Sequence, residues 1–241
     1  MPNSTPIASS FRSDSHISRI INMTFSTLER RGSIQNIIHV IIVLPGLLIT
    51  GFMVRFGLAN NKTFRKIYLW LYFLGKSISD SQNIALIKRF IHPGAIVLDI
   101  GAAFGFYSFL SSKLASTEGK IMSFEPDPMS RLFLADLVEK RHLSNVEIFP
   151  FAIWDDNIEL DLNICKENPG ENSLIKQSIH EKSITVPAIS LDKHFNLPPV
   201  DFVKVDVQGG EYHVLKGMEN VIRRSPNIVL IIECTPVYLQ S

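Results

Sequence analysis

The stretch from Ile96 to Phe109 constrains the fold more than any other part of the sequence. It begins with a short apolar run rich in β-branched residues, Ile96–Ile100, which is typical of a buried strand. Gly101 and Gly105 follow, and the apolar residues after them recur with helical period. A strand, a glycine turn and a helix in this order predict an α/β fold around a mostly parallel sheet. Because such a turn exposes bare backbone and the first N–H groups of the helix lack partners, we expect a ligand site there.

Two acidic residues accompany this turn. Asp99 precedes Gly101 by two residues, and Glu125 ends a second predicted strand 24 residues after Gly101. A dinucleotide fingerprint reads GxGxxG and has an acid about 20 residues further on that binds the ribose hydroxyls. The middle glycine is missing here, which disfavours a nicotinamide cofactor. A carboxylate at Asp99 suits a ligand that carries positive charge, and Glu125 is expected to accept hydrogen bonds from a ribose.

Composition excludes some functions. The 241 residues carry a net charge of only +1, from 24 basic and 23 acidic side chains, so no basic footprint for a nucleic acid is present. The two cysteines lie in dissimilar contexts and predict neither a disulfide framework nor a metal site. A reducing compartment is the simpler assumption.

The N-terminal part of the chain divides into two segments. Residues 1–36 are polar and are expected to form a poorly ordered tail, whereas residues 37–75 read as an apolar and aromatic helical extension. The run Ile37–Val54 has 18 residues without a formal charge, but Pro45 and Gly46 interrupt it. We therefore expect 37–74 to make peripheral contact with a membrane rather than to span it.

Residues 76–241 are expected to form the main domain. Asp80 and Asp127 are predicted helix caps, the second with Pro128 at the first helical position. An antiparallel insertion is predicted at about 156–192. The remaining predicted elements are a strand over 146–151, a strand over 201–207 with an exit turn at 208–211, a helix that follows this turn and includes 214–222, and a strand over 227–233.

A second cluster of functional residues is predicted at the end of the strand over 201–207. Lys204 lies inside an apolar strand, where a charge is costly unless it is paired. Asp206 follows two residues later and therefore points to the same face. Since ligands bind at the carboxyl ends of the strands in open α/β sheets, both residues are candidates for the site.

Three ordered motifs together resemble the FkbM-type family of class I S-adenosylmethionine-dependent methyltransferases. They are the glycine turn with its preceding acid, the run Phe124–Pro128, and Lys204–Glu211, and the resemblance extends from about Ile84 to Glu233. It implies a Rossmann-like sheet with helices on both faces, an N-terminal helical extension and S-adenosylmethionine as cofactor. The residues implied in cofactor binding are Asp99, Gly101, Ala102, Gly105, Glu125, Pro126, Ala152, Trp154 and Asp155.

The chemistry that the resemblance implies is methyl transfer to a hydroxyl of a sugar, a lipid or a secondary metabolite. Asp206 is the first candidate for the base or for orienting the acceptor, and Glu211 and Lys204 are further catalytic candidates. His213 is expected to face solvent or to serve packing. Because the cofactor is cytoplasmic, we expect a cytoplasmic protein, at the cytoplasmic face of a membrane if 37–74 contacts lipid.

Two departures from the family pattern support an alternative interpretation. Gln208 stands where the family has an acid, and the chain ends eight residues past Glu233, without the helix and antiparallel strands that usually complete a class I sheet. We therefore also consider a truncated descendant of the family that binds cofactor or a partner without turnover. Asn172–Leu174 resembles, weakly, a segment of the family's insertion.

Overall fold

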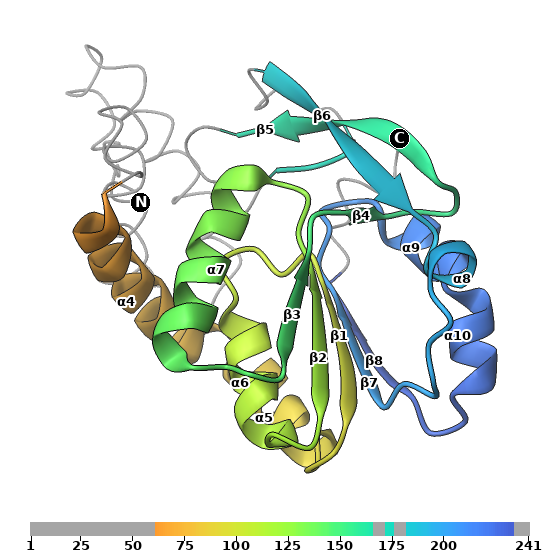
Figure 1. The fold of residues 1–241 in the computed structure, drawn as a ribbon, viewed down its shortest axis with the longest axis horizontal. Coiled ribbons are helices and arrows are strands. Elements are labelled where there is room, and N and C mark those ends of the chain that lie inside the picture. The colour runs from red at the N-terminus through yellow and green to blue at the C-terminus, as the bar shows by residue number, and fades with distance from the viewer. Residues whose placement is uncertain (1–60, 166–171, 176–181, 234–241) are drawn as a thin grey trace, which may run out of the picture. The chain divides into compact units, whose positions relative to one another are not determined.

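The computed structural model describes residues 61–165, 172–175 and 182–233, and the chain divides into two units, 1–79 and 80–241 (Figure 1). The predictions for 1–36 and for Ile37–Val54 lie outside the described residues, as do those for the end of the chain beyond Glu233.

The described part of the first unit is helix α4, Lys62–Ser79. It contains no acidic residue, and its exposed large apolar side chains recur at helical spacing along one stripe: Phe64, Ile67, Trp70 and Leu74. No helix among the described residues has both the length and the apolar character needed to cross a membrane.

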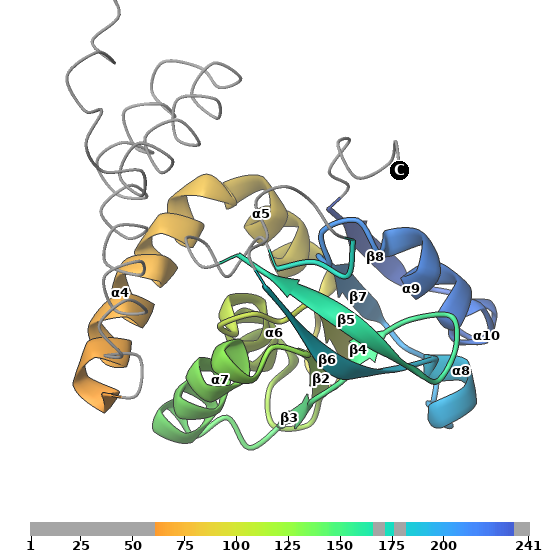
Figure 2. The same cartoon turned by 90° about the horizontal axis from the view of Figure 1, so that it is seen from above.

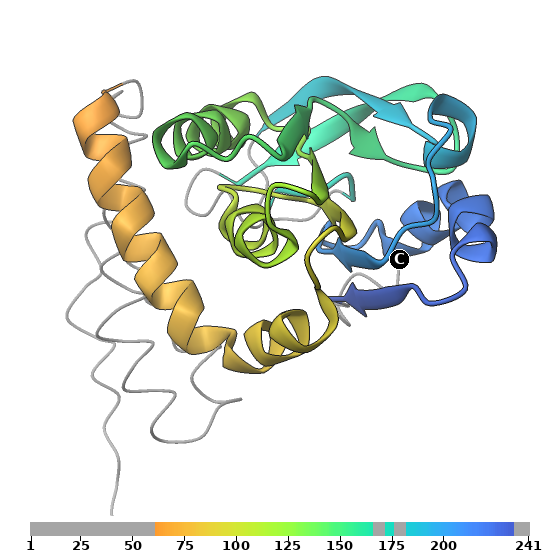
Figure 3. The same ribbon diagram turned by 60° about the horizontal axis from the view of Figure 1, so that its bottom comes forward.

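The second unit is built on a five-stranded sheet whose strands all run parallel, in the order β3-β2-β1-β7-β8. The strands are β1 Ile96–Ile100, β2 Lys120–Phe124, β3 Val146–Phe149, β7 Phe202–Val205 and β8 Val229–Ile232. Helix α5, Ser81–Phe90, leads into β1. Figures 1 and 3 show the helices on both faces, α6 Phe106–Ala115 and α7 Pro128–Arg141 on one, α8 Leu191–His194, α9 Glu211–Gly217 and α10 Glu219–Arg224 on the other. The predicted α/β fold is confirmed.

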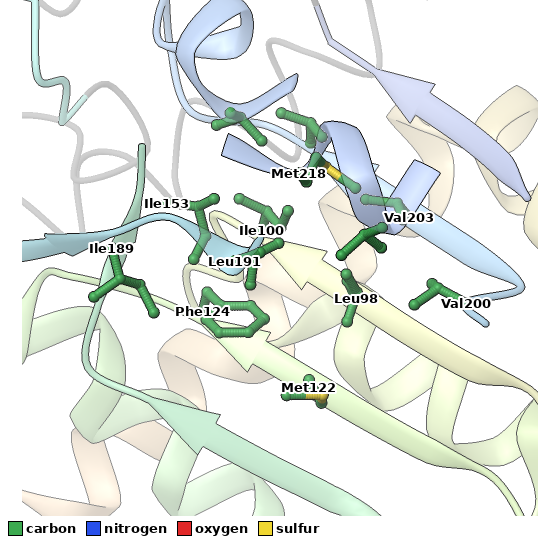
Figure 4. Close-up of a cluster of buried hydrophobic side chains, with 13 residues drawn as sticks. Leu98, Ile100, Met122, Phe124, Ile153, Ile189, Leu191, Val200, Val203 and Met218 are labelled. Carbon is green, nitrogen blue, oxygen red and sulfur yellow. The ribbon is translucent and has the colours of Figure 1, made fainter. Parts of the chain in front are cut away.

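The two faces of the sheet differ in chemistry. Leu98, Phe124 and Val203 belong to a buried apolar cluster that includes residues of α8, α9 and α10 (Figure 4). The alternate positions of the same strands place polar side chains on the opposite face, the one covered by α6. There Asp99 and Lys204 occupy paired positions in β1 and β7, and both are buried. This polar face lies directly below the predicted ligand turn.

A second, three-stranded sheet of order β4-β6-β5 lies beyond the carboxyl ends of the parallel strands (Figures 1 and 2). Its strands are β4 Ala152–Ile153, β5 Ile158–Ile164 and β6 Lys182–Ile189. β5 pairs with β6 in antiparallel fashion and β4 pairs with β6 in parallel. The sheet therefore stands next to the end of the main sheet where ligands bind in open α/β folds.

Several predicted element boundaries are wrong in detail. β3 ends at Phe149 because Pro150 lacks the N–H that would continue the ladder, and the chain then moves to the second sheet. The single helix predicted after the exit turn at 208–211 is two helices that break at Met218. A Cβ on Gly217 would lie 1.8 Å from the carbonyl oxygen of Trp154, so this approach of two backbones requires a glycine at the break.

The two predicted helix caps had different outcomes. The Asp127 carboxylate accepts from the N–H groups of Met129 and Ser130, and α7 begins at Pro128, as predicted. Asp80 precedes α5 but makes no side-chain capping bond; its carboxylate accepts from the Tyr107 hydroxyl instead, at 2.5 Å. A tertiary hydrogen bond has replaced the local one.

Candidate active site

The glycine turn after β1 is held in a conformation that only glycine adopts easily. Gly101 and Gly105 have φ angles of +77° and +85°. A Cβ on Gly101 would lie 1.9 Å from the carbonyl oxygen of Asp206, and a Cβ on Gly105 would lie 2.4 Å from Leu134. The backbone contact requires a glycine at position 101, whereas the leucine methyl groups near Gly105 can move and its positive φ is the stronger reason for a glycine there. Gly101 brings the turn after β1 against the end of β7.

Asp99 is buried below this turn. Its Oδ2 accepts a 2.5 Å hydrogen bond from the Ser108 hydroxyl, which also lies 2.8 Å from the hydroxyl of Ser123. Its Oδ1 is buried and has no hydrogen-bond partner among the described residues. Burial raises the pKa of Asp99, and the Lys204 ammonium opposes that shift. An unsatisfied buried acceptor in this position fits a ligand or a water that donates to it.

Glu125 lies at the carboxyl end of β2 and joins two loops. Its Oε2 accepts from the Ala103 N–H at 2.7 Å, and its Oε1 accepts from the Asp127 N–H at 2.8 Å. The Arg131 guanidinium donates to the main-chain carbonyl of Glu125 at 2.9 Å and to that of Pro126. Burial is the main cause that raises the pKa of Glu125 to about 8, partly opposed by the hydrogen bond from Asp127. Each carboxylate oxygen retains a lone pair that could accept from a ribose hydroxyl.

Lys204 and Asp206 are brought together as predicted. The Lys204 side chain is 2% exposed and donates to Asp206 Oδ2 at 2.8 Å, whereas the Asp206 side chain is 18% exposed. The ammonium also lies 4.4 Å from the centre of the Tyr107 ring. The carboxylate is therefore fixed from below by a buried cation while one side remains accessible from the end of the sheet.

The turn after β7 supplies further contacts around this acid. Gln208 Nε2 donates to Asp206 Oδ1 at 3.0 Å, and the Gln208 backbone is left-handed with a φ of +53°. The Ser173 hydroxyl of the insertion donates to the Gln208 carbonyl at 2.6 Å. Glu211 is buried and its Oε1 accepts from the Gly209 N–H at 2.9 Å, which closes the turn. The hydrogen bond from Ser173 thus connects the insertion to the turn after β7.

The segment after β4 packs against α9. The indole of Trp154 stacks on His213 with ring centres 3.8 Å apart, and its edge lies against Gly210. Asp155 is ion-paired with Lys216 at 3.0 Å, and this hydrogen bond lowers the pKa of Asp155. His213 Nδ1 lies 3.1 Å from Asp155 Oδ2. His213 thus contacts both Trp154 and Asp155, and the cofactor role of Trp154 and Asp155 stays a prediction, as does that of the buried Ala152.

The structure adds residues that the sequence motifs did not single out. Ser108 and Tyr107 lie in the first turn of α6 and contact Asp99 and Lys204 on the polar face of the sheet. The only sequence signal of Tyr107 and Ser108 is a polar group in an otherwise apolar helix. Ser173, which lies in the segment Asn172–Leu174 that weakly resembles the family's insertion, donates to the Gln208 carbonyl in the turn after β7. No group of His, Cys, Asp or Glu with metal-binding geometry occurs in the described part of the chain.

The chemistry of these side chains fits S-adenosylmethionine. The Glu125 oxygens at the end of β2 could accept from a ribose, and the buried Oδ1 of Asp99 could accept from a ligand at the turn, as predicted from the sequence. Ala102, between the two glycines, is buried at the start of the same turn. Asp206 follows the neighbouring strand β7. These residues meet because β1 stands between β2 and β7.

Comparison with known proteins gives an independent result. Residues 99–239 match the methyltransferase FkbM domain. The hexuronic acid methyltransferase AglP of Haloferax volcanii is 28% identical over 155 residues, which cover 63% of this chain and 61% of that protein. Methyltransferase 1 of Beauveria bassiana is 24% identical over 148 residues, covering 52% of this chain and 59% of that protein. The chain thus matches about three fifths of the length of these relatives.

Among solved structures, methyltransferase FkbM from Methylobacillus flagellatus aligns with a TM-score of 0.41 and 14% identity, over 89% of this chain and 48% of that chain. The family match begins at the acid of β1 and includes the second strand end, the insertion and the turn after β7. It therefore contains the glycine turn, Glu125 and the Lys204–Asp206 pair. This chain belongs to the FkbM methyltransferase family, whose cofactor is S-adenosylmethionine.

Proposed function

We propose that this protein transfers a methyl group to a hydroxyl oxygen of a sugar or of a lipid-linked or other small molecule. One observation carries the proposal: the Asp206 carboxylate is held by Lys204 and Gln208 at the end of β7 and is still partly exposed. The relative from Haloferax volcanii, a hexuronic acid methyltransferase, supports a sugar as acceptor. S-adenosylmethionine supplies an electrophilic methyl group when it is bound.

Asp206 would act on the acceptor hydroxyl. A hydroxyl oxygen that attacks a methyl group must be aligned with the bond between sulfur and the methyl carbon, which breaks in the transfer. Orientation therefore accounts for much of the rate. The Lys204 ammonium at 2.8 Å favours the ionised form of Asp206, and an ionised carboxylate is a hydrogen-bond acceptor only. Asp206 can therefore hold the hydroxyl through its proton and receive that proton as the oxygen–carbon bond forms.

The other two predicted catalytic residues have supporting contacts. Lys204 is 2% exposed, so it acts on the acceptor through Asp206. Glu211 accepts from the Gly209 N–H and would shape the turn that carries Gln208. We therefore assign a direct role to Asp206 and positioning roles to Lys204 and Glu211.

Gln208 bears on the alternative of a non-catalytic descendant. Its amide donates to Asp206 Oδ1, so the substitution of the family's acid keeps a hydrogen bond to the candidate base. An acid in the same place would bring a second negative charge to Asp206. We infer that the site is competent with glutamine.

The test begins with calorimetric titration of the protein with S-adenosylmethionine and with NAD. We expect binding of the first only. Hexuronic acids, other glycosides and lipid-linked sugars are then screened with methyl-labelled cofactor, and the methylated atom is located by NMR. Methyl transfer to nitrogen would overturn the hydroxyl assignment, and cofactor binding without transfer to any acceptor would favour the non-catalytic alternative.

We also propose peripheral membrane contact through 37–74, at the cytoplasmic face where the cofactor is available. Within the described residues, the supporting observation is the exposed apolar stripe of α4 on a helix that carries basic but no acidic side chains. Such helices lie at lipid interfaces and are attracted by anionic headgroups. The protein should then cosediment with anionic vesicles and be released by carbonate. Equal partition to neutral and anionic vesicles would remove the electrostatic part of the proposal.

A further inference from the structure

The Lys204 ammonium has more donors than hydrogen-bond acceptors around it. A lysine ammonium has three N–H donors, and among the described residues Lys204 makes one hydrogen bond, to Asp206 Oδ2. Its side chain is only 2% exposed, so bulk water does not solvate the charge. A buried charge of this kind needs further compensation.

Part of that compensation comes from the Asp99 carboxylate, which is paired with Lys204 across β1 and β7, and the Tyr107 ring adds to it. The ring centre lies 4.4 Å from Lys204 Nζ, within the distance at which the negative face of an aromatic ring attracts a cation. The ring is itself fixed. Its hydroxyl donates to Asp80 Oδ2 at 2.5 Å, and Phe106 meets it edge-on with ring centres 5.2 Å apart.

The position of Tyr107 in the fold gives this contact a consequence for the site. Tyr107 is the second residue of α6, directly after the glycine turn that is expected to bind the cofactor. Lys204 lies in β7, and it orients the carboxylate expected to bind the acceptor. The Tyr107 ring therefore connects α6, which follows the predicted cofactor turn, with Asp206 through the Lys204 ammonium.

We propose that Tyr107 is a positioning residue, which holds the Lys204 ammonium against Asp206 and so fixes the carboxylate for the acceptor. The inference rests on the proposed function for its catalytic consequence. The contact between the Tyr107 ring and the Lys204 ammonium does not depend on a bound cofactor or acceptor. Asp80 completes the arrangement, since it fixes the ring through the hydroxyl.

A double-mutant cycle tests whether Tyr107 acts through Lys204. We expect Tyr107→Leu to lower kcat about tenfold, with the KM for cofactor changed less than about twofold, because the lost interaction orients the acceptor side. In a Lys204→Met background the same substitution should change kcat by less than about twofold. An equal tenfold loss in both backgrounds would show that Tyr107 only fills space.

Two further variants separate the parts of the contact. Tyr107→Phe keeps the ring and loses the hydroxyl bond to Asp80, so we expect a loss of no more than about threefold in kcat. Phe90→Leu is the matched control, because it removes an exposed cation–π contact with Arg89 in the same unit, 5.3 Å from the ring centre. It should leave kcat unchanged. A loss in Phe90→Leu as large as in Tyr107→Leu would refute the specific role of Tyr107.

A chemical readout tests this contact between ring and ammonium without any acceptor. Brief acylation with acetic anhydride, read by mass spectrometry, should label Lys204 at least about fivefold faster in Tyr107→Leu than in the unchanged protein. The exposed Lys120 should be labelled equally in both. Unchanged protection of Lys204 would overturn the proposal even if the protein is an active methyltransferase. Absence of cofactor binding would overturn the proposed function, whereas the acylation rate of Lys204 would still decide whether Tyr107 holds the ammonium.

Fluorinated phenylalanines at position 107 cover the case in which Tyr107→Leu does not fold. Added fluorine keeps the shape of the ring and withdraws negative charge from its face. Labelling of Lys204 should rise stepwise from phenylalanine through the mono- to the trifluoro side chain. A flat series would show that the face of the ring does not hold the ammonium.

Discussion

Replacement of Glu125 by glutamine should uncouple cofactor binding from pH. The carboxyl group accepts two backbone N–H groups and is buried, and burial raises its pKa to about 8. Ribose hydroxyls would donate to the ionised form and favour it. Binding should therefore release a proton from Glu125, and affinity should rise with pH up to about 8 and then become constant.

The magnitude follows from that pKa. With a value of about 8, about nine in ten Glu125 side chains are protonated at pH 7, so each bound cofactor should release about 0.9 proton. Below pH 8 the dissociation constant should increase about tenfold for each pH unit, until the pKa of the bound state is reached. Glu125→Gln loses the charged acceptor, so it should bind the cofactor more weakly than the unchanged protein by about 1–3 kcal/mol above pH 8.

Isothermal titration at pH 6, 7, 8 and 9 measures both quantities. Each titration is repeated in two buffers of different ionisation enthalpy, and the difference in heat gives the number of protons released. Glu125→Gln should show a dissociation constant that is nearly independent of pH and no proton release from this site. A flat pH profile in the unchanged protein, with no proton released at pH 7, would refute a protonated Glu125 or its contact with the ribose.

Other predictions concern stability and turnover. Folding raises the pKa of Glu125 from 4.5 to about 8, so its contribution to stability is complete below pH 4.5 and is lost as pH rises to about 8. The urea midpoint of the unchanged protein relative to Glu125→Gln should fall across that window, and a constant difference would contradict it. Asp206→Asn should lower kcat about 10²–10⁴-fold and change cofactor affinity little, as measured by single turnover and calorimetry; an intact rate would make Asp206 structural. Gln208→Glu places a second carboxylate beside Asp206, so the pH dependence of kcat should move to higher pH. An unchanged pH dependence would show that the side chain at position 208 does not affect the ionisation of Asp206. Gly101→Ala places a Cβ 1.9 Å from the Asp206 carbonyl, so urea denaturation should show a loss of more than about 2 kcal/mol, and a smaller loss would show that the end of β7 can move.

The sequence by itself determined the features that depend on local pattern. The alternation of side chains along a strand placed Lys204 and Asp206 on one face, and the structure joins them at 2.8 Å. The Asp127–Pro128 pair predicted the start of α7 from side-chain chemistry alone. The glycine turn between a strand and a helix predicted the fold class, since only few topologies accept that order of elements.

Tertiary structure decided which neighbours each of these residues meets. The carbonyl of Asp206 lies against Gly101, and this contact follows from the pairing of β1 with β7, which the local glycine pattern does not predict. Asp80 gives up a local cap for the hydroxyl of Tyr107, and Ser173 reaches Gln208 across 35 residues of chain. Periodicity determines the face on which a side chain lies. The partner on that face depends on the order of the strands and the path of the insertion, and these are set by contacts between residues far apart in the chain.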